Sequence, residues 1–264
     1  MLVLSSAGVP SRIDQSDGEW CVFVAPVNVE AALYALDSFD RESAEPPPPP
    51  VAPEWGPTYA GAVMAAVLVA AYAVTGAADG TGDWYRRGSA SASAISGGEA
   101  WRAVTALMLH VDLTHLVGNV VAIAVFGAGV CRILGPGLGV WLVLVAGAGG
   151  NEVNALLRAQ GHSSVGASTA VFGAIGILSG LAAARGWAWR RTWTALGAGL
   201  ALLAMLGTGE RADLGAHFFG FLAGGMLGVA TGTFVARPPG RMVQSMLTLA
   251  AVGVVAASWA VALR

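Results

Sequence analysis

Long apolar segments separated by short polar stretches dominate the chain from residue 57 onward. Seven of them approach or exceed the roughly 18–20 residues that an α-helix needs to cross a bilayer. The predicted spans are 57–78, 113–133, 137–157, 165–184, 192–209, 213–235 and 242–263. His, Asn, Glu, Ser or Asp interrupt the second, third, fourth and sixth of these spans. Because polar groups are costly inside a membrane, these interruptions are the first candidates for functional residues.

The first 45 residues show a different pattern. A short opening helix precedes two β runs, 11–15 and 20–25, and the intervening Ser16-Asp-Gly18 has hairpin chemistry. Apolar residues at helical spacing then predict a helix over 29–39. Residues 1–45 therefore predict a small α+β domain, a regulatory or structural appendage whose core is marginal in isolation. It lacks the basic start and cleavage site of a signal peptide, so we expect it in the cytosol.

Residues 46–56 predict a linker between this domain and the first apolar span. Five consecutive prolines, 46–50, favour a semi-rigid polyproline II spacer, and binding to a proline-recognising partner is the alternative. The net charge of −2 is unevenly divided across the linker. Residues 1–56 carry nine acidic and two basic residues, whereas the remainder carries seven acidic and twelve basic residues. The two parts are therefore different kinds of structure.

Composition favours a polytopic membrane protein. Hydrophobic residues make up 55% of the chain and charged residues 11%, whereas soluble domains carry about a quarter charged residues. Cys21 and Cys131 form no CxxC pair and indicate neither a disulfide framework nor a zinc site.

Arginines gather after spans two, four and six, which predicts a cytosolic N-terminus and an external C-terminus. Arg86, Arg87 and Arg102 depart from this pattern, because they lie in the first outer loop.

The fourth span opens with a serine among small residues, in the segment Ser164-Val-Gly-Ala-Ser-Thr-Ala-Val-Phe-Gly173. Gly166 and Ala167 permit close backbone packing, and a helix that begins here points free N–H groups toward Ser168. This arrangement suits a nucleophile with an oxyanion hole. A helix-packing surface is the structural alternative, because small residues with serine are common at helix contacts in membranes.

The sixth span opens with Asp213-Leu-Gly-Ala-His-Phe-Phe-Gly220, and its histidine, His217, lies at a depth similar to that of Ser168. A nucleophile at matched depth favours a general base over a purely structural histidine. Asp213 lies one helical turn earlier and nearer the interface, so we expect a serine–histidine dyad. Three glycines then recur at four-residue spacing and form a smooth face for a neighbouring helix: Gly220, Gly224 and Gly228.

The second span carries His115 and Asn119, which share one helix face because they are four residues apart. An imidazole and an amide aimed at one point are suitable donors to a developing oxyanion. Hydrogen bonding between helices is the structural alternative. A metal site built from His110, His115 and His217 is a further alternative, but no carboxylate or thiolate completes a familiar ligand set. We therefore expect no metal and no cofactor.

The combination and order of these motifs resemble the rhomboid family of intramembrane serine proteases. The shared elements are Trp101-Arg102 in the first outer loop, His115-x-x-x-Asn119, Gly166-x-Ser168, and Gly215-Ala-His217-x-x-Gly220-x-x-x-Gly224. The resemblance covers roughly 57–235 as a six-helix core, and 242–263 adds a further transmembrane helix. The implied fold class is an all-α polytopic membrane protein with a small N-terminal cytosolic α+β domain.

The resemblance also implies roles for these residues. Ser168 would be the nucleophile and His217 its general base, and the oxyanion would be stabilised by His115, Asn119 and the Ser168 backbone N–H. Trp101 and Arg102 would shape the first loop. Gly166, Gly220 and Gly224 would complete the site by allowing close approach of the backbone.

The implied activity is cleavage of transmembrane helices in membrane-protein substrates. The expected partners are these substrates and the lipid bilayer, without nucleic acid, and the expected location is a bacterial inner membrane. A catalytically inactive rhomboid-like protein that binds membrane clients is the alternative. A small-solute transporter is disfavoured, because no internal repeat with paired broken helices is visible.

One position departs from the family pattern, because Thr169 follows the serine where glycine is usual. Its side chain could crowd the interface between spans four and six. Alternatively, its hydroxyl could bond back to a carbonyl one turn earlier, which would make it a harmless occupant. The sequence favours the harmless alternative, since the remaining catalytic positions are all present.

Overall fold

The computed structural model describes residues 2–16, 18–43, 54–78, 82–159, 161–186 and 213–264, together with Gly197. The chain divides into two compact units, Met1–Val51 and Ala52–Arg264. The predicted fifth span, 192–209, lies outside the described residues except for Gly197, and so does most of the predicted linker.

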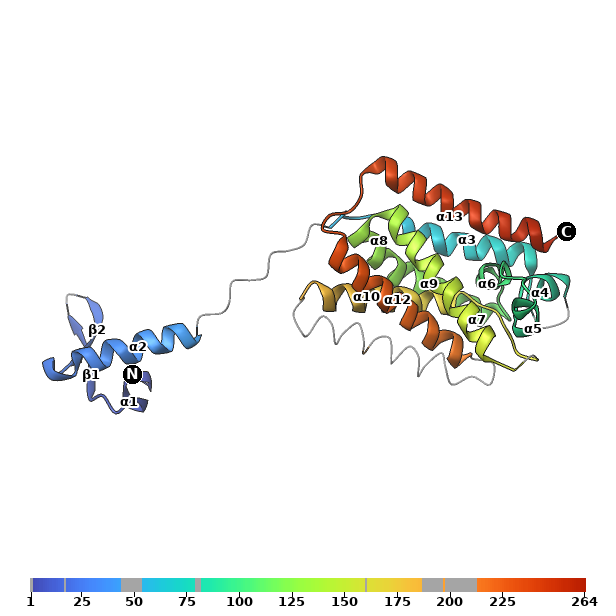
Figure 1. Ribbon diagram of the computed structural model, residues 1–264. Coiled ribbons are helices and arrows are strands. Elements are labelled where there is room, and N and C mark those ends of the chain that lie inside the picture. Colours follow the sequence, from blue (N-terminus) through green and yellow to red (C-terminus); the bar gives the residue numbers. More distant parts are fainter. Residues whose placement is uncertain are drawn as a thin grey trace. The chain divides into compact units, whose positions relative to one another are not determined.

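The N-terminal unit contains a β-hairpin and two helices (Figure 1). Strands β1 (Ser11–Ser16) and β2 (Glu19–Val24) pair antiparallel between α1 (Leu2–Ser6) and the segment formed by η1 (Pro26–Asn28) and α2 (Val29–Ser43). The elements follow the order predicted from the sequence. The buried core consists of Leu4, Val9 and Ala32, with Val24 and Ala35 packed against it. So few buried apolar groups contribute little to the free energy of folding.

The second unit is built from long apolar helices. Their bounds are α3 (Ala60–Thr75), α7 (Leu113–Ala122) continuing through the π-helical turn η3 (Ile123–Gly127) into α8 (Ala128–Leu134), α9 (Pro136–Leu157), α10 (Ser168–Ala184), α12 (Leu214–Phe234) and α13 (Arg241–Ala262). Among the described residues, four continuous helical segments are long and apolar enough to cross a membrane, whereas α3 and α10 are apolar but shorter. Together with the small N-terminal α+β unit, this confirms the predicted fold class.

The segment between α3 and α7 folds into a compact set of short elements. They are α4 (Asp83–Gly88), β3 (Ala90–Ser91), α5 (Ala92–Ser96), α6 (Arg102–Thr105) and η2 (Ala106–Met108). Strand β3 pairs antiparallel with β4 (Ser163–Ser164), which precedes α10. Arg102 Nη1 donates to the carbonyls of Arg86 (2.8 Å) and Ser89 (3.3 Å). Hydrogen bonds of Arg102 therefore stabilise the first loop internally. The β3–β4 pairing joins this loop to the segment that leads into α10.

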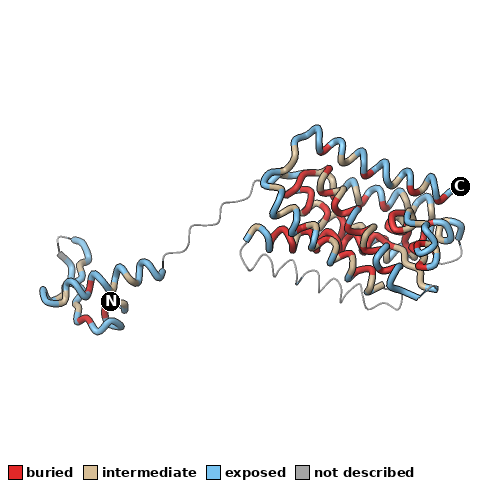
Figure 2. Tube along the Cα trace, viewed as in Figure 1, coloured by how far each residue is buried: buried red, intermediate tan, exposed pale blue. Residues whose placement is uncertain are grey.

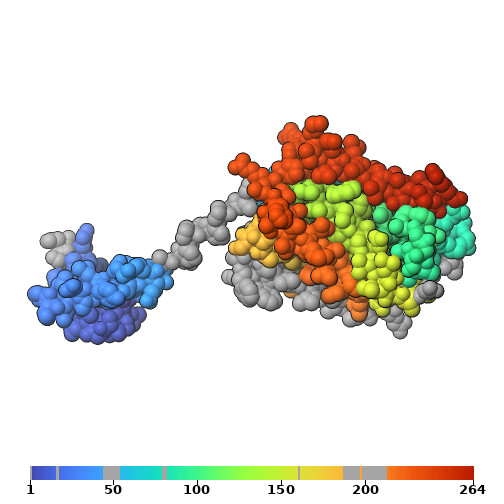
Figure 3. All heavy atoms as spheres, in the orientation of Figure 1, coloured from blue at the N-terminus to red at the C-terminus, as the bar shows by residue number. Residues whose placement is uncertain are grey.

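Helix α10 is the central helix of this unit. Fourteen of its seventeen residues are buried, and Figure 2 shows this burial extending through the middle of the helical unit. It packs against both α9 and α12. Helix α9 in turn reaches the surface between α12 and α13 in the space-filling view (Figure 3). Polar groups at the start of α10 are consequently enclosed by protein, although the helix itself is apolar.

Glycines bring α10 and α12 into backbone contact. A Cβ atom on Gly220 would lie 2.3 Å from the Thr169 carbonyl oxygen, and one on Gly224 would lie 2.1 Å from that of Gly173. A Cβ atom on Gly228 would likewise lie 2.3 Å from the Ile177 carbonyl oxygen. Any side chain at these positions would force the helices apart, so the glycine spacing sets the distance between the two helix axes.

Helix α13 is attached at both ends and borders an apolar cavity. Near its start, buried Gln244 donates to the Leu134 carbonyl (2.8 Å) and accepts from the Leu138 N–H (2.9 Å). Near its end, Trp259 packs edge-on against Trp84.

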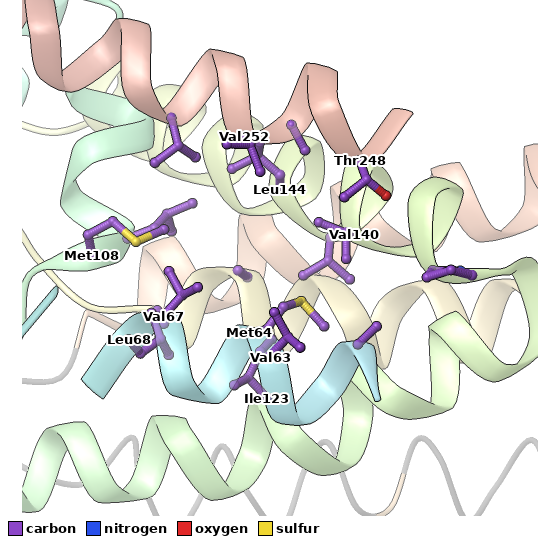
Figure 4. A pocket seen from close by; sticks show the side chains of 18 of the residues that line it. Val63, Met64, Val67, Leu68, Met108, Ile123, Val140, Leu144, Thr248 and Val252 are labelled. Carbon is purple, nitrogen blue, oxygen red and sulfur yellow. The ribbon is translucent and has the colours of Figure 1, made fainter. Parts of the chain in front are cut away.

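Between α3, α9 and α13 lies a cavity of about 640 Å³ (Figure 4). Its lining includes Val63, Met64, Val67, Leu68, Leu144 and Val252.

Candidate active site

The turn before α10 requires glycine at position 166. Gly166 has a φ of +129°, which L side chains rarely adopt, and its N–H donates to the Ala106 carbonyl at 2.9 Å. A Cβ atom here would also lie 2.6 Å from Cε1 of His115. The absence of a side chain therefore lets the His115 ring approach the start of α10, where the first backbone N–H groups have no acceptor within the helix.

Ser168 and His217 are in hydrogen-bond contact. Ser168 is the first residue of α10, and its Oγ lies 2.8 Å from Nε2 of His217 near the start of α12. Their exposed fractions are 7% and 4%. His217 also stacks on Phe172, with ring centroids 4.6 Å apart and planes 27° from parallel. When the serine hydroxyl donates to Nε2, the proton of the neutral imidazole resides on Nδ1.

The stacking partner Phe172 was not singled out from the sequence. It lies four residues after Ser168, on the same face of α10, and its ring fixes the orientation of the imidazole. The i, i+4 spacing from the serine is the signal that could have identified it. His217 Nδ1 is buried and has no hydrogen-bond partner among the described residues. In the part of the chain that the structure describes, no carboxylate bonds to the second ring nitrogen of His217.

His115 and Asn119 lie on one face of α7 beside this pair. Asn119 is 1% exposed, and its Nδ2 donates to the His115 carbonyl at 3.0 Å. An amide nitrogen carries two hydrogens, so one N–H of Asn119 remains for a ligand. The missing side chain of Gly166 leaves room between the His115 ring and Ser168, since a Cβ there would lie 3.5 Å from the serine Oγ. The His115 ring therefore lies close to Ser168, and Asn119 follows one turn later on the same face of α7.

His110 supports the backbone next to the serine, which the sequence did not predict. It is completely buried, packs edge-on against the His115 ring and lies with Nε2 3.5 Å from the Ala167 N–H. Burial, reinforced by His115, lowers the pKa of His110 to about 4. The neutral ring can accept the Ala167 hydrogen bond at physiological pH. Nε2 of His110 faces the Ala167 backbone. The contact between the His110 and His115 rings is therefore explained by the support that His110 gives to this backbone.

Thr169 differs from the sequence-based expectation that was favoured for it. Its hydroxyl donates to Asn151 Oδ1 on α9 (2.8 Å), so the expected bond to a carbonyl of its own helix is wrong. Its methyl group lies next to Gly150 and Gly220, where α10 meets α9 and α12. Asn151 also donates to the Ala103 carbonyl at 2.9 Å. Thr169 is thus part of a buried polar connection from α10 through α9 to the first loop.

Trp101 and Arg102 occupy the start of α6 in the first loop. The Arg102 side chain is 12% exposed, pairs with Glu99 and donates to loop carbonyls as described above. These contacts stabilise the loop, and they do not bring the guanidinium to the serine–histidine pair. The predicted site residues therefore separate into a group around Ser168 and a group that supports the first loop.

The structure thus has a buried serine–histidine pair near the starts of two packed apolar helices. Residues 97–234, just over half of the chain, match the family model described as the Rhomboid domain. The chain therefore belongs to the rhomboid family and is an integral membrane protein, which confirms the resemblance found in its motifs.

Individual relatives agree with this family membership. RHOMBOID-like protein 5 of Arabidopsis thaliana is 32% identical over 138 residues, which cover 51% of this chain and 45% of that protein. Rhomboid protease GluP of Bacillus subtilis (strain 168) is 28% identical over 172 residues, covering 63% and 33%. Putative rhomboid protease YdcA of the same organism is 35% identical over 85 residues, covering 31% and 42%. The chain thus spans less than half the length of each of these curated relatives.

Proposed function

We propose that this chain is an intramembrane serine endopeptidase that cleaves the transmembrane helices of membrane proteins. The observation that carries the proposal is the 2.8 Å contact between His217 Nε2 and Ser168 Oγ inside a membrane protein of the rhomboid family. Burying a serine and a histidine between apolar helices costs free energy, and catalysis accounts for the presence of both. Names of two bacterial relatives, which include the words rhomboid protease, support the same activity.

In the proposed mechanism, Ser168 Oγ attacks the carbonyl carbon of the scissile peptide bond while His217 Nε2 takes the hydroxyl proton. The carbonyl oxygen becomes negatively charged and is stabilised by the Ser168 N–H, the free N–H of Asn119 and the His115 ring. His217 then gives its proton to the leaving amine, which leaves an acyl ester on Ser168. Water activated by His217 hydrolyses this ester and restores the serine.

The position of the site determines which substrates fit. The peptide must reach Ser168 in an extended form, and unravelling a helix in lipid exposes amides without partners. We therefore propose substrates with helix-weakening residues near the end that lies at the depth of Ser168. The arginine distribution supports a cytosolic N-terminus, and with that orientation the cleaved bond lies toward the outer side of the membrane.

The direct test uses the purified full chain in liposomes with a reporter that has one transmembrane helix carrying glycine and proline near its outer end. We expect cleavage within or next to that helix, with the new terminus identified by mass spectrometry. The control reporter replaces the glycine and proline with leucine, and it should be cleaved much more slowly. Equal cleavage of both reporters, or cleavage only in soluble regions, would contradict the proposed substrate class.

Replacing Asn119 with alanine should lower kcat and leave KM nearly unchanged, because the amide stabilises charge that exists only in the transition state. Loss of one oxyanion donor costs about 10²–10³ in rate, and less where several donors share the charge. Steady-state kinetics on the transmembrane reporter measures both constants. The matched control is Val117→Ala on an exposed position of the same helix. A rise in KM that accounts for the whole loss would make Asn119 a substrate-binding or packing residue.

Replacing Thr169 with glycine should leave turnover unchanged or reduced. The substitution deprives buried Asn151 Oδ1 of its hydroxyl donor, which costs roughly 1–3 kcal/mol of stability. Thr169→Ser keeps the hydroxyl and is the matched control, with near-normal melting temperature and turnover. An inactive wild type that gains proteolysis in Thr169→Gly would instead support the client-binding alternative.

A further inference from the structure

Asp213 organises the helix turn that carries His217. It is the N-cap residue of α12, and its Oδ1 accepts a hydrogen bond from the Ala216 N–H at 3.1 Å. Its backbone carbonyl accepts from the His217 N–H, also at 3.1 Å. Side chain and backbone of one residue therefore define the position of the first turn of α12.

The other carboxylate oxygen of Asp213 joins this turn to two further parts of the protein. Oδ2 accepts from Asn154 Nδ2 on α9 at 2.7 Å and from His162 Nε2 at 2.6 Å. Arg158 Nη2 lies 3.6 Å from Oδ1. The side chain of Asp213 is only 9% exposed, so these donors largely replace its hydration.

The surroundings of Asp213 favour its ionised form. Burial alone would raise the pKa of its carboxyl group, but hydrogen bonds from His162 and the Ala216 N–H outweigh burial and hold the pKa below its usual value. Hydrogen bonds to a charged acceptor are shorter and roughly twice as strong as those between neutral groups. The carboxylate is therefore a firm connection between α9, α12 and the segment that contains His162.

His162 belongs to the segment that leads directly to Ser168. Its carbonyl accepts from the Ala92 N–H at 2.9 Å, and the next two residues form β4 against β3. Gly166 is in turn bonded to Ala106. The first loop therefore fixes the backbone of this segment, and the contact of His162 with Asp213 fixes the segment relative to α12.

Gly215 makes room for this cluster. A Cβ atom at position 215 would lie 2.2 Å from Asn154 Oδ1 and 2.8 Å from Arg158 Nη2. The glycine two residues before His217 thus allows the polar side chains of α9 to reach the start of α12.

We propose that Asp213 is a positioning residue whose carboxylate holds the start of α12 against α9 and the His162 segment and thereby sets the distance between Ser168 Oγ and His217 Nε2. This inference rests on the proposed protease function. Asp213 acts through the helix, because its oxygens are bound to Ala216, Asn154 and His162, and not to the His217 ring.

The first test compares Asp213→Asn with Asp112→Asn. Both aspartates are N-caps that accept from an amide three residues later, and asparagine caps helices equally well. At position 213, however, asparagine places an NH₂ group where Asp213 has Oδ2. This NH₂ donor then faces the donors Asn154 Nδ2 and His162 Nε2, and their hydrogen bonds are lost. Asp112 is exposed, so its amide can turn toward water.

We expect Asp213→Asn to lower kcat about 10- to 100-fold, the loss typical of a small displacement of reacting groups. KM for the transmembrane reporter should be unchanged, and labelling of Ser168 by a fluorophosphonate probe should slow in parallel with kcat. Asp112→Asn should match the wild type in all three measurements. Thermal unfolding in detergent gives the folded fraction, by which each rate is corrected.

The second test exchanges donor and acceptor. Asn154→Asp alone places two carboxylates together and should also lower kcat. Combined with Asp213→Asn, it restores an amide donor opposite a carboxylate acceptor, so the double variant should be faster than either single variant. This rescue distinguishes a hydrogen-bonded connection from a general requirement for a charge at position 213.

Three results would overturn the inference: equal corrected kcat values for Asp213→Asn and Asp112→Asn, a loss of rate fully explained by unfolded protein, or no rescue in the double variant. Ser168→Ala in the same assay separates this inference from the proposed function. If Ser168→Ala cleaves as well as the wild type, the proposed function has failed. If cleavage requires Ser168 and is insensitive to Asp213→Asn, only the positioning role has failed.

Discussion

Ser168→Ala and His217→Ala should each reduce cleavage of the transmembrane reporter by at least about 10⁴-fold, and the double variant should be no slower than either single variant. The nucleophile and its base act as one unit, since Ser168 Oγ attacks only as His217 Nε2 takes its proton across the 2.8 Å contact. Removing the second member of a broken pair therefore has no further effect. Rates in liposomes, measured over hours to reach low values, provide the test.

The matched control is Ser179→Ala. Ser179 is a buried serine on the same helix, and its hydroxyl bonds back to the Ile175 carbonyl at 2.9 Å, so its loss should leave turnover near that of the wild type. Substantial proteolysis by Ser168→Ala would remove the serine from the mechanism. Multiplicative losses in the double variant would show that the two side chains act independently.

Gly224→Ala should destabilise the protein and strongly reduce its activity, although position 224 lies two turns beyond His217. The new Cβ would lie 2.1 Å from the Gly173 carbonyl oxygen, and neither backbone can yield without separating α10 from α12. Overpacking of this kind costs about 1–3 kcal/mol and occasionally more. Because the same two helices carry Ser168 and His217, their separation should also weaken the catalytic contact.

Gly225→Ala isolates this packing effect from the change in helix propensity. A Cβ at Gly225 would meet only the Gly176 carbonyl oxygen at 3.9 Å, an ordinary contact. Alanine favours a helix by about 1 kcal/mol over glycine in a soluble host, so Gly225→Ala should be neutral or slightly stabilising. Melting temperatures in detergent and fluorophosphonate labelling compare the two variants. Equal melting temperatures would show that the α10–α12 interface adjusts more easily than its backbone contacts indicate.

The fold class and most of the spans follow from the sequence because each depends on local properties. Apolar runs of sufficient length predicted α9, α12 and α13 within a few residues of their bounds, and Gly135-Pro136 ends one helix and begins the next. The hairpin at 11–24 followed from two β runs on either side of a turn sequence. Residue order and spacing also predicted Ser168, His217, His115 and Asn119 as site residues, since the family motif consists of residue types at fixed intervals.

Contacts between distant segments required the tertiary structure. The sequence favoured a bond from the Thr169 hydroxyl to a carbonyl one turn earlier. It could not show that this hydroxyl would instead donate to Asn151 on α9. Nor could it show that His162 and Asn154 would converge on Asp213, because hydrogen-bond partners 51 and 59 residues apart have no local signature. A sequence determines where polar side chains interrupt apolar helices. Only the packing of those helices, set here by glycines that permit backbone contact, determines which polar groups meet and what chemistry they can perform.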